Sequence, residues 1–368
     1  MREQHPIKEL LRATRHLWDH PGTPTNIREN FLKVLACGTI TLGAEVYSSG
    51  AEVKLVYHTC KSKFCTSCGQ RSTEAWQADL EAILPDIAYR GITLTMPCEF
   101  WPILQQNRHL LAGMSAMAAE AIQQWVKARY RARVLVIVVP HTFGGFLNFY
   151  PHLHVLVSEG GLQNSQGAWL PRLDYGKQAC MELMQAWRYA VIAYLAEALA
   201  AEVVRSELSN EDLRTLFELQ YNRKWHIHIS HGMSKRHFLR YVGRYVRRPP
   251  VAQHRLQRVT GHEVEYLAKD TRNHNRFCRV RFSNEQFLVI LKEQVPNRGA
   301  HAMRYFGLLA PRAKACTWGA IFTVLRQKKR PHPPRFSWRW LRWKTFGTDP
   351  LADSNGQVMH RVGWLAPS

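Results

Sequence analysis

The sequence predicts an α+β protein in which helices flank a mainly antiparallel sheet, behind an N-terminal module that holds a metal. Strongly β-like runs at 90–97, 133–140 and 151–158 stand between long helical patterns at 103–130 and 176–206, and this alternation favours an α+β domain. Four of the eight cysteines fall within one short region near the N-terminus, whereas the others are scattered. A local cluster of this kind indicates metal binding rather than disulfides.

The composition indicates a polyanionic partner. The 368 residues include 50 Lys and Arg against 28 Asp and Glu, a formal charge of +22, so nucleic acid is the first candidate partner and a membrane surface the second. No apolar run approaches the ~20 residues of a spanning helix, and the N-terminus lacks the apolar segment of a signal peptide. We therefore expect a soluble, intracellular protein of two or three domains.

The N-terminal region is expected to be helical on both sides of the cysteines. Helical patterns cover 7–18 and 26–36, separated by the turn-like stretch DHPGTPT. A third helix is predicted over 72–84, with Ser72 as its N-terminal cap.

The run CKSKFCTSC predicts a zinc site. It places Cys60, Cys65 and Cys68 close together, and Zn²⁺ takes four nitrogen or sulfur ligands in a tetrahedron. His58 is the local candidate for the fourth ligand, and a reduced loop without metal is the alternative. The cations that flank the cysteines and can contact DNA phosphates are Lys61, Lys63 and Arg71.

The central region is expected to contribute the sheet and its long helices. The glycine-containing segment HTFGGFLNFY joins the strands at 133–140 and 151–158. The elements expected after residue 206 are a strand at 224–230, a helix at 234–248 that ends before two prolines, a hairpin of 261–270 and 276–283, and a helix at 284–295.

Two histidines interrupt the apolar strand FYPHLHVLVS. Side chains alternate along a strand, so His152 and His154 share one face and can bind one cation if a third ligand approaches from elsewhere. They can equally be satisfied core histidines. The stretch WHIHIS contains a second pair, His226 and His228, with the same spacing, so spacing alone does not choose between the pairs.

A helix with paired tyrosines helps to decide which histidine pair belongs to a functional site. Tyr241 and Tyr245 lie four positions apart and are therefore neighbours on one helix face. They stand between an expected apolar stripe and an arginine face, so their hydroxyls can meet a phosphate backbone that the arginines attract. Boundary packing is the plainer interpretation. The stripe consists of Phe238, Leu239, Val242 and Val246, and the arginine face of Arg240, Arg244 and Arg247.

These motifs resemble those of one enzyme family. PHLHVLVSEGGL resembles the signature of HUH endonucleases (His, hydrophobic residue, His), and YVGRYVRRPPVA resembles the paired-tyrosine motif of the rolling-circle transposases of the insertion sequence 91 family. VVPHTFGGFLNFYPHLH, AMRYFGLLAPR, CGTITLG and HTCKSKFCTSCGQ are also similar to that family. The similarity runs over nearly the whole chain and preserves the order of the motifs.

The resemblance implies an HUH nuclease-like antiparallel sheet and a mechanism. His152 and His154 would hold a divalent cation, Mg²⁺ or Mn²⁺, and Tyr241 and Tyr245 would be the nucleophiles. One tyrosine would cut single-stranded DNA at the element's end and keep a 5′-phosphotyrosine link, leaving a free 3′-hydroxyl, and the second would allow another cleavage. The third metal ligand stays open, with His141 and His228 as candidates. The implied setting is the bacterial cytoplasm, at the nucleoid.

The domain organisation that we expect combines the resemblance with a change to a basic, Pro-rich and aromatic composition after about residue 311. Cys37 would be the fourth ligand of a structural Zn²⁺. Residues 1–85 would form a helical, zinc-binding N-terminal module, 86–310 the catalytic domain, and 311–368 a basic, aromatic tail.

The chain departs from the family at two places. Relatives commonly carry a C-x-x-C-G where this chain reads VYSSG, and another after D-P-L, where this chain has Ala352 and Asn355 in place of cysteines. Our hypothesis is that the two pairs jointly bind a second zinc in relatives and that this chain has lost that site as a unit.

The tail KKRPHPPRFSWRWLRWK alternates cations with tryptophans. Such a stretch can bind single-stranded DNA, with cations on phosphates and rings stacked on bases. The tryptophans can instead pack on the catalytic domain and leave only the charges in water.

A transposase is therefore the expected function, with two rivals. A rolling-circle replication initiator or relaxase would use the same chemistry, but the zinc module and the context RYVRRPPVA favour a transposase. A non-catalytic zinc-dependent DNA-binding protein is the rival of a different class, against which the intact histidine and tyrosine motifs argue.

Overall fold

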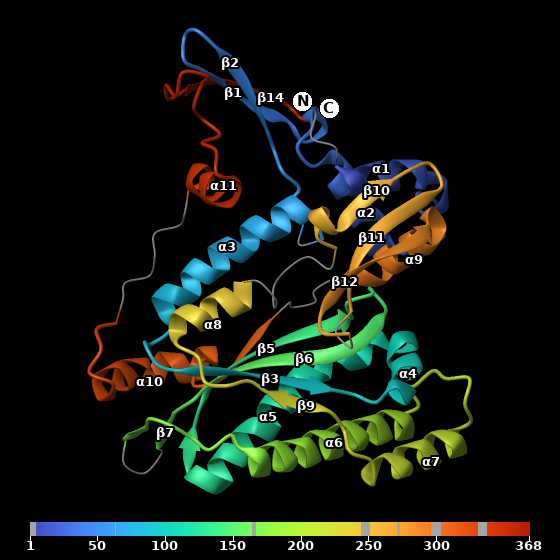
Figure 1. Cartoon of the computed structure of the whole chain (residues 1–368), viewed down its shortest axis with the longest axis vertical. Helices are drawn as coiled ribbons and strands as arrows, with labels where there is room; N and C mark the ends of the chain where they lie inside the picture. The colour runs from blue at the N-terminus through green and yellow to red at the C-terminus, as the bar shows by residue number, and fades with distance from the viewer. Residues whose placement is uncertain are drawn as a thin grey trace.

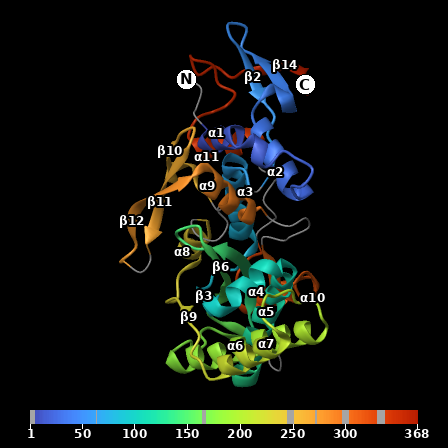
Figure 2. The same ribbon diagram turned by 90° about the vertical axis from the view of Figure 1, so that its right-hand side faces the viewer.

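The computed structural model describes residues 5–62, 64–163, 167–243, 251–270, 273–295, 303–329 and 337–368. Helices α6 (Lys177–Ala200) and α7 (Asn210–Tyr221) lie at one end of the molecule, beneath a central sheet, and a hairpin lies at the other end (Figures 1 and 2). No helix within the described ranges is long and apolar enough to cross a membrane.

A five-stranded antiparallel sheet forms the centre of the molecule. Its strand order is β13-β5-β6-β3-β9, and every neighbouring pair is antiparallel, so the predicted α+β architecture with an antiparallel sheet is confirmed. The strands are β3 (Tyr89–Thr95), β5 (Leu135–Phe143), β6 (Phe149–Ser158), β9 (Ile227–Ile229) and β13 (Arg304–Gly307). A small second sheet is formed by β4 (Ala132–Arg133), β7 (Gly161–Gln163) and β8 (Trp169–Leu170).

Helices cover both faces of the central sheet. The first face packs against α4 (Trp101–Gln106), α5 (Leu111–Tyr130) and α6 in the largest apolar core, where Trp187 also donates from its indole N–H to the carbonyl of Thr95 at 2.9 Å. The second face packs against α3 (Thr66–Ile83), α8 (Lys235–Tyr241) and α10 (Pro311–Val324). There Tyr89 of β3 stacks on Phe238 of α8 with ring centroids 4.5 Å apart.

The N-terminal helices share a core with a segment from late in the sequence. This core includes Trp18 and Phe31 from the N-terminal region, and Tyr266 and Phe287 from the later segment, all fully buried. Its elements are α1 (Pro6–Ala13), α2 (Thr25–Ala36), β10 (Leu256–Val259), β11 (Glu263–Asp270), β12 (Arg276–Ser283) and α9 (Asn284–Gln294). The predicted hairpin and the helix after it are present at β11, β12 and α9.

The C-terminal segment returns to the N-terminal region. Strand β14 (His360–Leu365) pairs with β1 (Ala44–Ser48), which in turn pairs with β2 (Val53–Tyr57). Helix α11 (Trp338–Phe346) contacts α3. Contacts thus cross both boundaries that the sequence predicts, at 85 and at 310.

Several predicted element ends differ from the structure. The helix that we expected from Ser72 begins at Thr66 with Cys65 at its N-cap position, so Ser72 lies inside α3 and is not its N-cap. The helix expected over 103–130 breaks at Asn107, because its side-chain amide donates to the carbonyls of Ile103 and Arg205 and competes with helical hydrogen bonding.

Other differences concern length and number of elements. The helix expected over 176–206 ends at Ala200, and α7 was not expected although Ser209 and Asp212 form a capping box at its start. The hairpin β1–β2 was not expected either. The helix expected over 234–248 is described as far as residue 243, and residues 244–250 lie outside the description.

Candidate functional site

Three histidines meet on the second face of the central sheet. His152 and His154 stand at alternate positions of β6, and His141 of β5 is the direct cross-strand neighbour of His152. One ring nitrogen from each of the three lies within 4.8 Å of the others. His141, one of the two candidates for the third ligand, thus lies with His152 and His154. It can do so because β5 extends to Phe143, beyond the end at residue 140 that the sequence pattern predicted.

The ring nitrogens of the histidine pair converge. Nε2 of His152 lies 3.2 Å from Nε2 of His154, while Nδ1 of His152 lies 2.8 Å from the carbonyl oxygen of Tyr150. A ring N–H donated to that carbonyl leaves Nε2 of His152 as a lone-pair donor. Two nitrogens about 2.1 Å from one ion would be roughly 3.0 to 3.4 Å apart, so the observed separation fits two ligands of one metal.

The environment keeps these imidazoles neutral. Burial, with a smaller contribution from His141, lowers the pKa of His152 to about 4. Burial, with contributions from His141 and His152, lowers the pKa of His154 to about 2. Neutral imidazole is the form that coordinates metals, so the site presents its ligands ready for binding at neutral pH.

Tyr241 lies over the same face of the sheet, at the end of α8. Its hydroxyl is 3.6 Å from the position that a Cβ would take at Gly91 of β3. Gly91 stands two residues before Thr93, which is the cross-strand neighbour of His154, so the two β3 residues share a face about 7 Å apart. The absence of a side chain at Gly91 therefore provides room for the tyrosine ring on the sheet face that carries the histidines.

The rest of the tyrosine motif is only partly described. Phe238, Leu239 and Val242 are buried, as the predicted apolar stripe requires, and Arg240 is exposed. Tyr245 lies outside the described residues, as do the other predicted members of the stripe and of the arginine face, Val246, Arg244 and Arg247.

The second histidine pair does not join the three histidines. Both are exposed; His226 directly precedes the edge strand β9 and His228 lies on it, with β3 between β9 and β6. His228 is the cross-strand neighbour of Thr93. Gly91 and Thr93 could not be predicted as site residues, because no local motif gives a signal for them and only the strand register brings them to the site.

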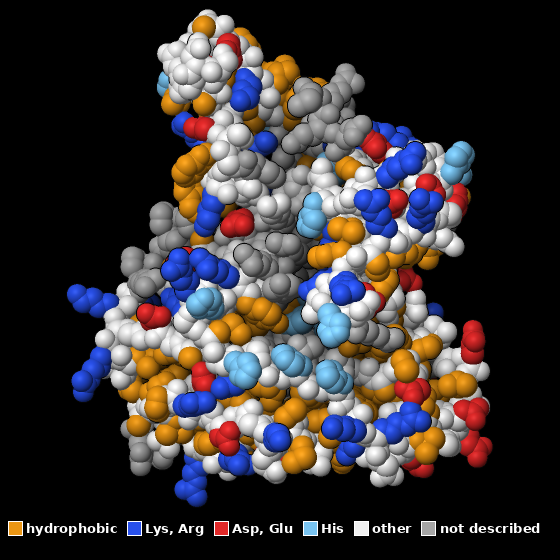
Figure 3. Space-filling view, in the orientation of Figure 1, with side chains coloured by type: hydrophobic (Ala, Val, Ile, Leu, Met, Phe, Trp, Pro, Cys, Tyr) orange, Lys and Arg blue, Asp and Glu red, His pale blue; other side chains and the backbone are white. Residues whose placement is uncertain are grey.

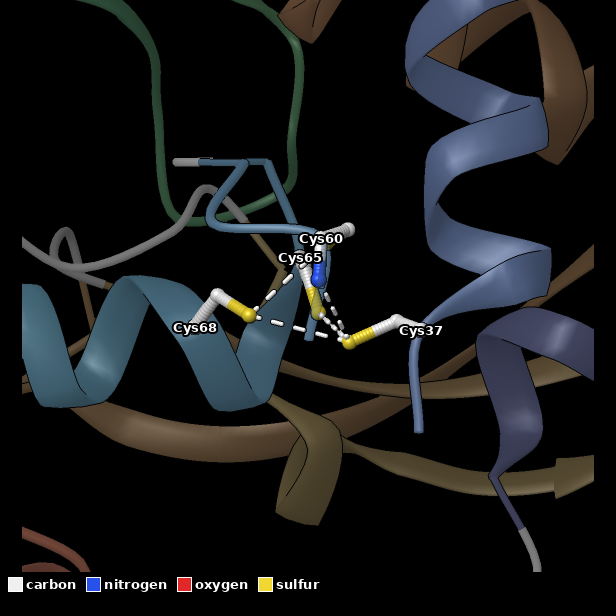
Figure 4. Close-up of side chains that lie close together, drawn as sticks. All are labelled: Cys37, Cys60, Cys65 and Cys68. Atoms are coloured by element: carbon white, nitrogen blue, oxygen red, sulfur yellow. Dashed lines mark hydrogen bonds between the residues drawn. The ribbon is translucent and has the colours of Figure 1, made fainter. Parts of the chain in front are cut away.

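Four cysteines converge in the N-terminal region (Figure 4). The Sγ–Sγ distances are 3.6 Å for Cys37–Cys68 and 3.7 Å for both Cys60–Cys68 and Cys37–Cys65. A tetrahedron with Zn–S bonds of about 2.3 Å has sulfurs about 3.8 Å apart, so the four thiols fit one zinc ion.

Polar neighbours surround the cysteine cluster. Arg71 donates from Nη2 to Sγ of Cys68 at 3.4 Å and to the hydroxyl of Thr59 at 2.9 Å. The Nζ of Lys8, a buried residue, donates to the carbonyl of Cys37. His58, the alternative fourth ligand, instead directs its nitrogens at the carbonyl of Leu42 and the carboxylate of Glu45.

The two places where this chain departs from relatives lie side by side. The backbone N–H of Ser354 donates to the carboxylate of Glu52 at 3.3 Å, and Lys54 donates to the carbonyl of Ala352 at 3.3 Å. Polar contacts thus join residues just after the VYSSG stretch to the stretch that follows D-P-L. This proximity supports the hypothesis of a second zinc site lost as a unit, which stays a prediction.

The tryptophans of the tail differ in their exposure. Trp338 and Trp340 are half-buried and lie beneath Arg342 and Lys344, at 5.6 and 4.8 Å from cation to ring centroid. Trp343 is 54% exposed and so can be reached by a ligand.

Known proteins with similar sequences identify the chain. Residues 136–316 match a family described as "Putative transposase", and residues 10–96 match the "Transposase zinc-binding domain" of the IS91 type. The "Transposase for insertion sequence element IS801" of Pseudomonas savastanoi pv. phaseolicola is 31% identical over 94% of this chain and 86% of its own. The "Putative transposase y4qJ" of Sinorhizobium fredii (strain NBRC 101917 / NGR234) is 25% identical over 80% of this chain and 77% of its own.

The sheet, the cysteine cluster and these relatives define the class. The protein is a transposase, an enzyme that cleaves DNA and transfers its strands, with an N-terminal zinc-binding domain. Within that class, the chain belongs to the IS91 family. No solved structure matches it.

Proposed function

We propose that this transposase nicks and rejoins single-stranded DNA at the ends of its mobile element, through a 5′-phosphotyrosine intermediate, in rolling-circle transposition. The observation that carries the proposal is the placement of Tyr241 beside Gly91, on the sheet face where His141, His152 and His154 meet. Phosphoryl transfer to a protein side chain requires a nucleophile held near a metal-ligand set, here a helix residue held over the sheet face that carries the ligands.

The three histidines are the proposed ligands of a catalytic cation. A divalent ion there would act as a Lewis acid on the oxygens of the scissile phosphate. Three imidazole nitrogens are a poor donor set for Mg²⁺, which prefers oxygen ligands, and suit a transition metal such as Mn²⁺ better. We therefore expect Mn²⁺ to support cleavage at lower concentration than Mg²⁺.

The protein's own part in the reaction is to position the tyrosines. The tyrosine oxygen forms a bond to phosphorus and loses its proton, while the bond from phosphorus to the 3′-oxygen breaks and that oxygen leaves as a 3′-hydroxyl. Tyr241 and Tyr245 are both proposed nucleophiles, which allows a second cleavage before the first link is resolved. Rejoining is the reverse attack, by a 3′-hydroxyl on the phosphotyrosine.

We also propose the setting of this activity. Residues 1–85 would form the zinc-binding module, 86–310 the catalytic domain and 311–368 an accessory tail, with the protein acting in the cytoplasm on DNA of the nucleoid. The formal charge of +22 supports contact with a DNA backbone.

A covalent-adduct assay tests the proposal. The protein is incubated with labelled single-stranded DNA that carries the element's end and with Mn²⁺ or Mg²⁺, and the mixture is separated under denaturing conditions. We expect an adduct that disappears in the double variant Tyr241→Phe and Tyr245→Phe and in His152→Ala. A non-catalytic DNA-binding protein would give a mobility shift in native gels but no adduct. An adduct that survives in the double tyrosine variant would overturn the assignment of the nucleophiles.

A further inference from the structure

The two histidine pairs of the sequence lie in register on one face of the sheet. His154 of β6, Thr93 of β3 and His228 of β9 are consecutive cross-strand neighbours. A second row consists of His152, Thr95 and His226. His152 and Thr95 are cross-strand neighbours, and the backbone N–H and the hydroxyl of Thr95 both donate to the carbonyl of His226. Directly opposed residues of antiparallel strands share a face, so both rows point toward the same side as the metal-ligand histidines.

The outer pair differs from the inner pair in its exposure. His152 is 8% exposed, whereas His226 and His228 are exposed to solvent, the first directly before the edge strand and the second on it. Strands lie about 4.8 Å apart, so the outer pair stands roughly 10 Å from the inner pair across β3. Trp225 and Ile227, between and beside the outer histidines, are buried in the main core, which holds β9 and fixes where the imidazoles point.

Exposed cationic and imidazole side chains continue from the outer pair to the tyrosine. The chain from β9 to α8 presents these groups at the surface, and histidines form a line across this face of the molecule, over β9 and toward α8 (Figure 3). The exposed cationic and imidazole residues of this segment are His226, His228, His231, Arg236, His237 and Arg240. No carboxylate interrupts the segment from 225 to 243.

We propose that His226 and His228 form a second subsite, which binds a backbone phosphate of the DNA strand next to the scissile one. This inference rests on the proposed strand-transfer function and assigns a path to the substrate, from Tyr241 across β3 to β9. An imidazole N–H donates to a phosphate oxygen whether the ring is neutral or charged, and an exposed pair on a fixed strand presents two such donors together.

Binding without metal tests the subsite apart from the chemistry. Affinity for a fluorescein-labelled 24-nucleotide single strand that carries the element's end is measured by anisotropy in EDTA. We expect the double variant His226→Ala and His228→Ala to bind about tenfold more weakly than the wild type, because two hydrogen bonds to a charged group are lost. The matched control, His262→Ala and His360→Ala, removes two exposed histidines elsewhere and should bind as the wild type does.

A scan with neutral linkages then locates the contact. Single methylphosphonates are placed at successive positions of the strand. In the wild type, a methylphosphonate at one position near the scissile phosphate should weaken binding. In the double variant of His226 and His228, a methylphosphonate at that position should not weaken binding further, whereas substitutions at other contacted positions still should. An unchanged affinity of the double variant in EDTA, or an identical scan profile, would overturn the inference; the first result would also be expected if the pair were a second metal site.

The binding assay and the adduct assay together distinguish a failure of this inference from a failure of the proposed function. If the wild type forms no adduct but its binding depends on the outer pair, the proposed chemistry fails and the subsite stands. If the adduct forms and binding is independent of the outer pair, the chemistry stands and the subsite fails. Both substituted side chains are at the surface, so folding, checked by the thermal midpoint, should change little.

Discussion

At the scale of single residues, the environment of the inner histidines favours their neutral form. His152 is buried, and its Nδ1 faces the carbonyl of Tyr150, so both its charge state and its ring orientation are defined before any ion binds. The exposed histidines on β9 lack this environment. The difference explains why two identical sequence spacings are expected to serve different purposes.

Burial of the inner histidines predicts acid sensitivity of the metal-free protein. The unfolded chain protonates these rings near a pKa of 6.5, whereas the folded protein holds the pKa of His152 at about 4 and that of His154 at about 2. Below pH 6.5 the unfolded state therefore binds more protons, and the free energy of unfolding falls as the pH falls. Urea unfolding in EDTA at pH 7 and pH 4.5 should show a loss of a few kcal/mol from these two rings.

A variant isolates this contribution. Other groups also titrate between pH 7 and 4.5, so the comparison is with the double substitution His152→Gln and His154→Gln. That variant should lose less of its unfolding free energy over the same range. Equal losses in the two proteins would show that the histidines are not held neutral by the fold.

Arg71 should tune the zinc site without being a ligand. It donates to Sγ of Cys68, and such partners of metal ligands typically contribute 10- to 100-fold in metal affinity. The zinc affinity of Arg71→Ala, measured by competition with a chromophoric chelator, should therefore be at least about tenfold lower than that of the wild type. Lys61→Ala, an exposed cation of the same loop, serves as the control. Zinc retention equal to that of the wild type would contradict the role.

At the scale of elements, β3 decides how the tyrosine helix meets the metal site. A Cβ at Gly91 would lie 3.5 Å from the ring of Tyr241, an ordinary contact distance, but a larger side chain would not fit. The strand thus needs a small residue at a position that both the ring of Tyr241 and the hydroxyl of Ser230 approach.

Substitutions at Gly91 provide a graded test. Gly91→Ala should retain adduct formation, whereas Gly91→Val should displace the ring of Tyr241 and reduce the adduct by tenfold or more. Valine suits a β-strand, so the sheet itself should persist, which circular dichroism can check. Wild-type levels of adduct in the valine variant would show that the hydroxyl does not act from this position.

The sequence pattern predicted elements better than their ends. Apolar alternation located the strands at β3, β5 and β6, and the same-face histidine pair follows from the period of two. The position of His141 opposite His152 depends on how far β5 extends and on its register, which no local pattern encodes. The break at Asn107 likewise depends on a hydrogen bond to Arg205, far along the chain.

At the scale of the whole molecule, the two ends of the chain meet in one sheet. Strand β14 pairs along all of β1, while β2 contributes the other side. This closure could not be predicted, because the residues involved are about 300 positions apart. It also means that the tail contributes to the structure of the N-terminal region.

Removal of the last strand should destabilise that region selectively. An isolated two-stranded hairpin is at best marginally stable in water, so deletion of residues 357–368 should expose the amides of β1 and β2 to hydrogen exchange. Amides of β5 and β6, in the central sheet, should keep their protection. Equal protection of β1 in the truncated and full-length proteins would contradict the structural role of β14.

Helix α3 connects the cysteine cluster to the tyrosine helix α8 and fixes the orientation of its two ends relative to each other. It begins at the cysteine cluster, with Cys68 in its first turn, and further along Gln77 donates to the carbonyl of Leu239 in α8, two residues before the tyrosine. Each residue of an α-helix advances the side chains by about 100°. A single residue inserted between Cys68 and Gln77 would therefore turn the metal-binding end away from the tyrosine end, so in this segment the count of residues is constrained even where their identity is not.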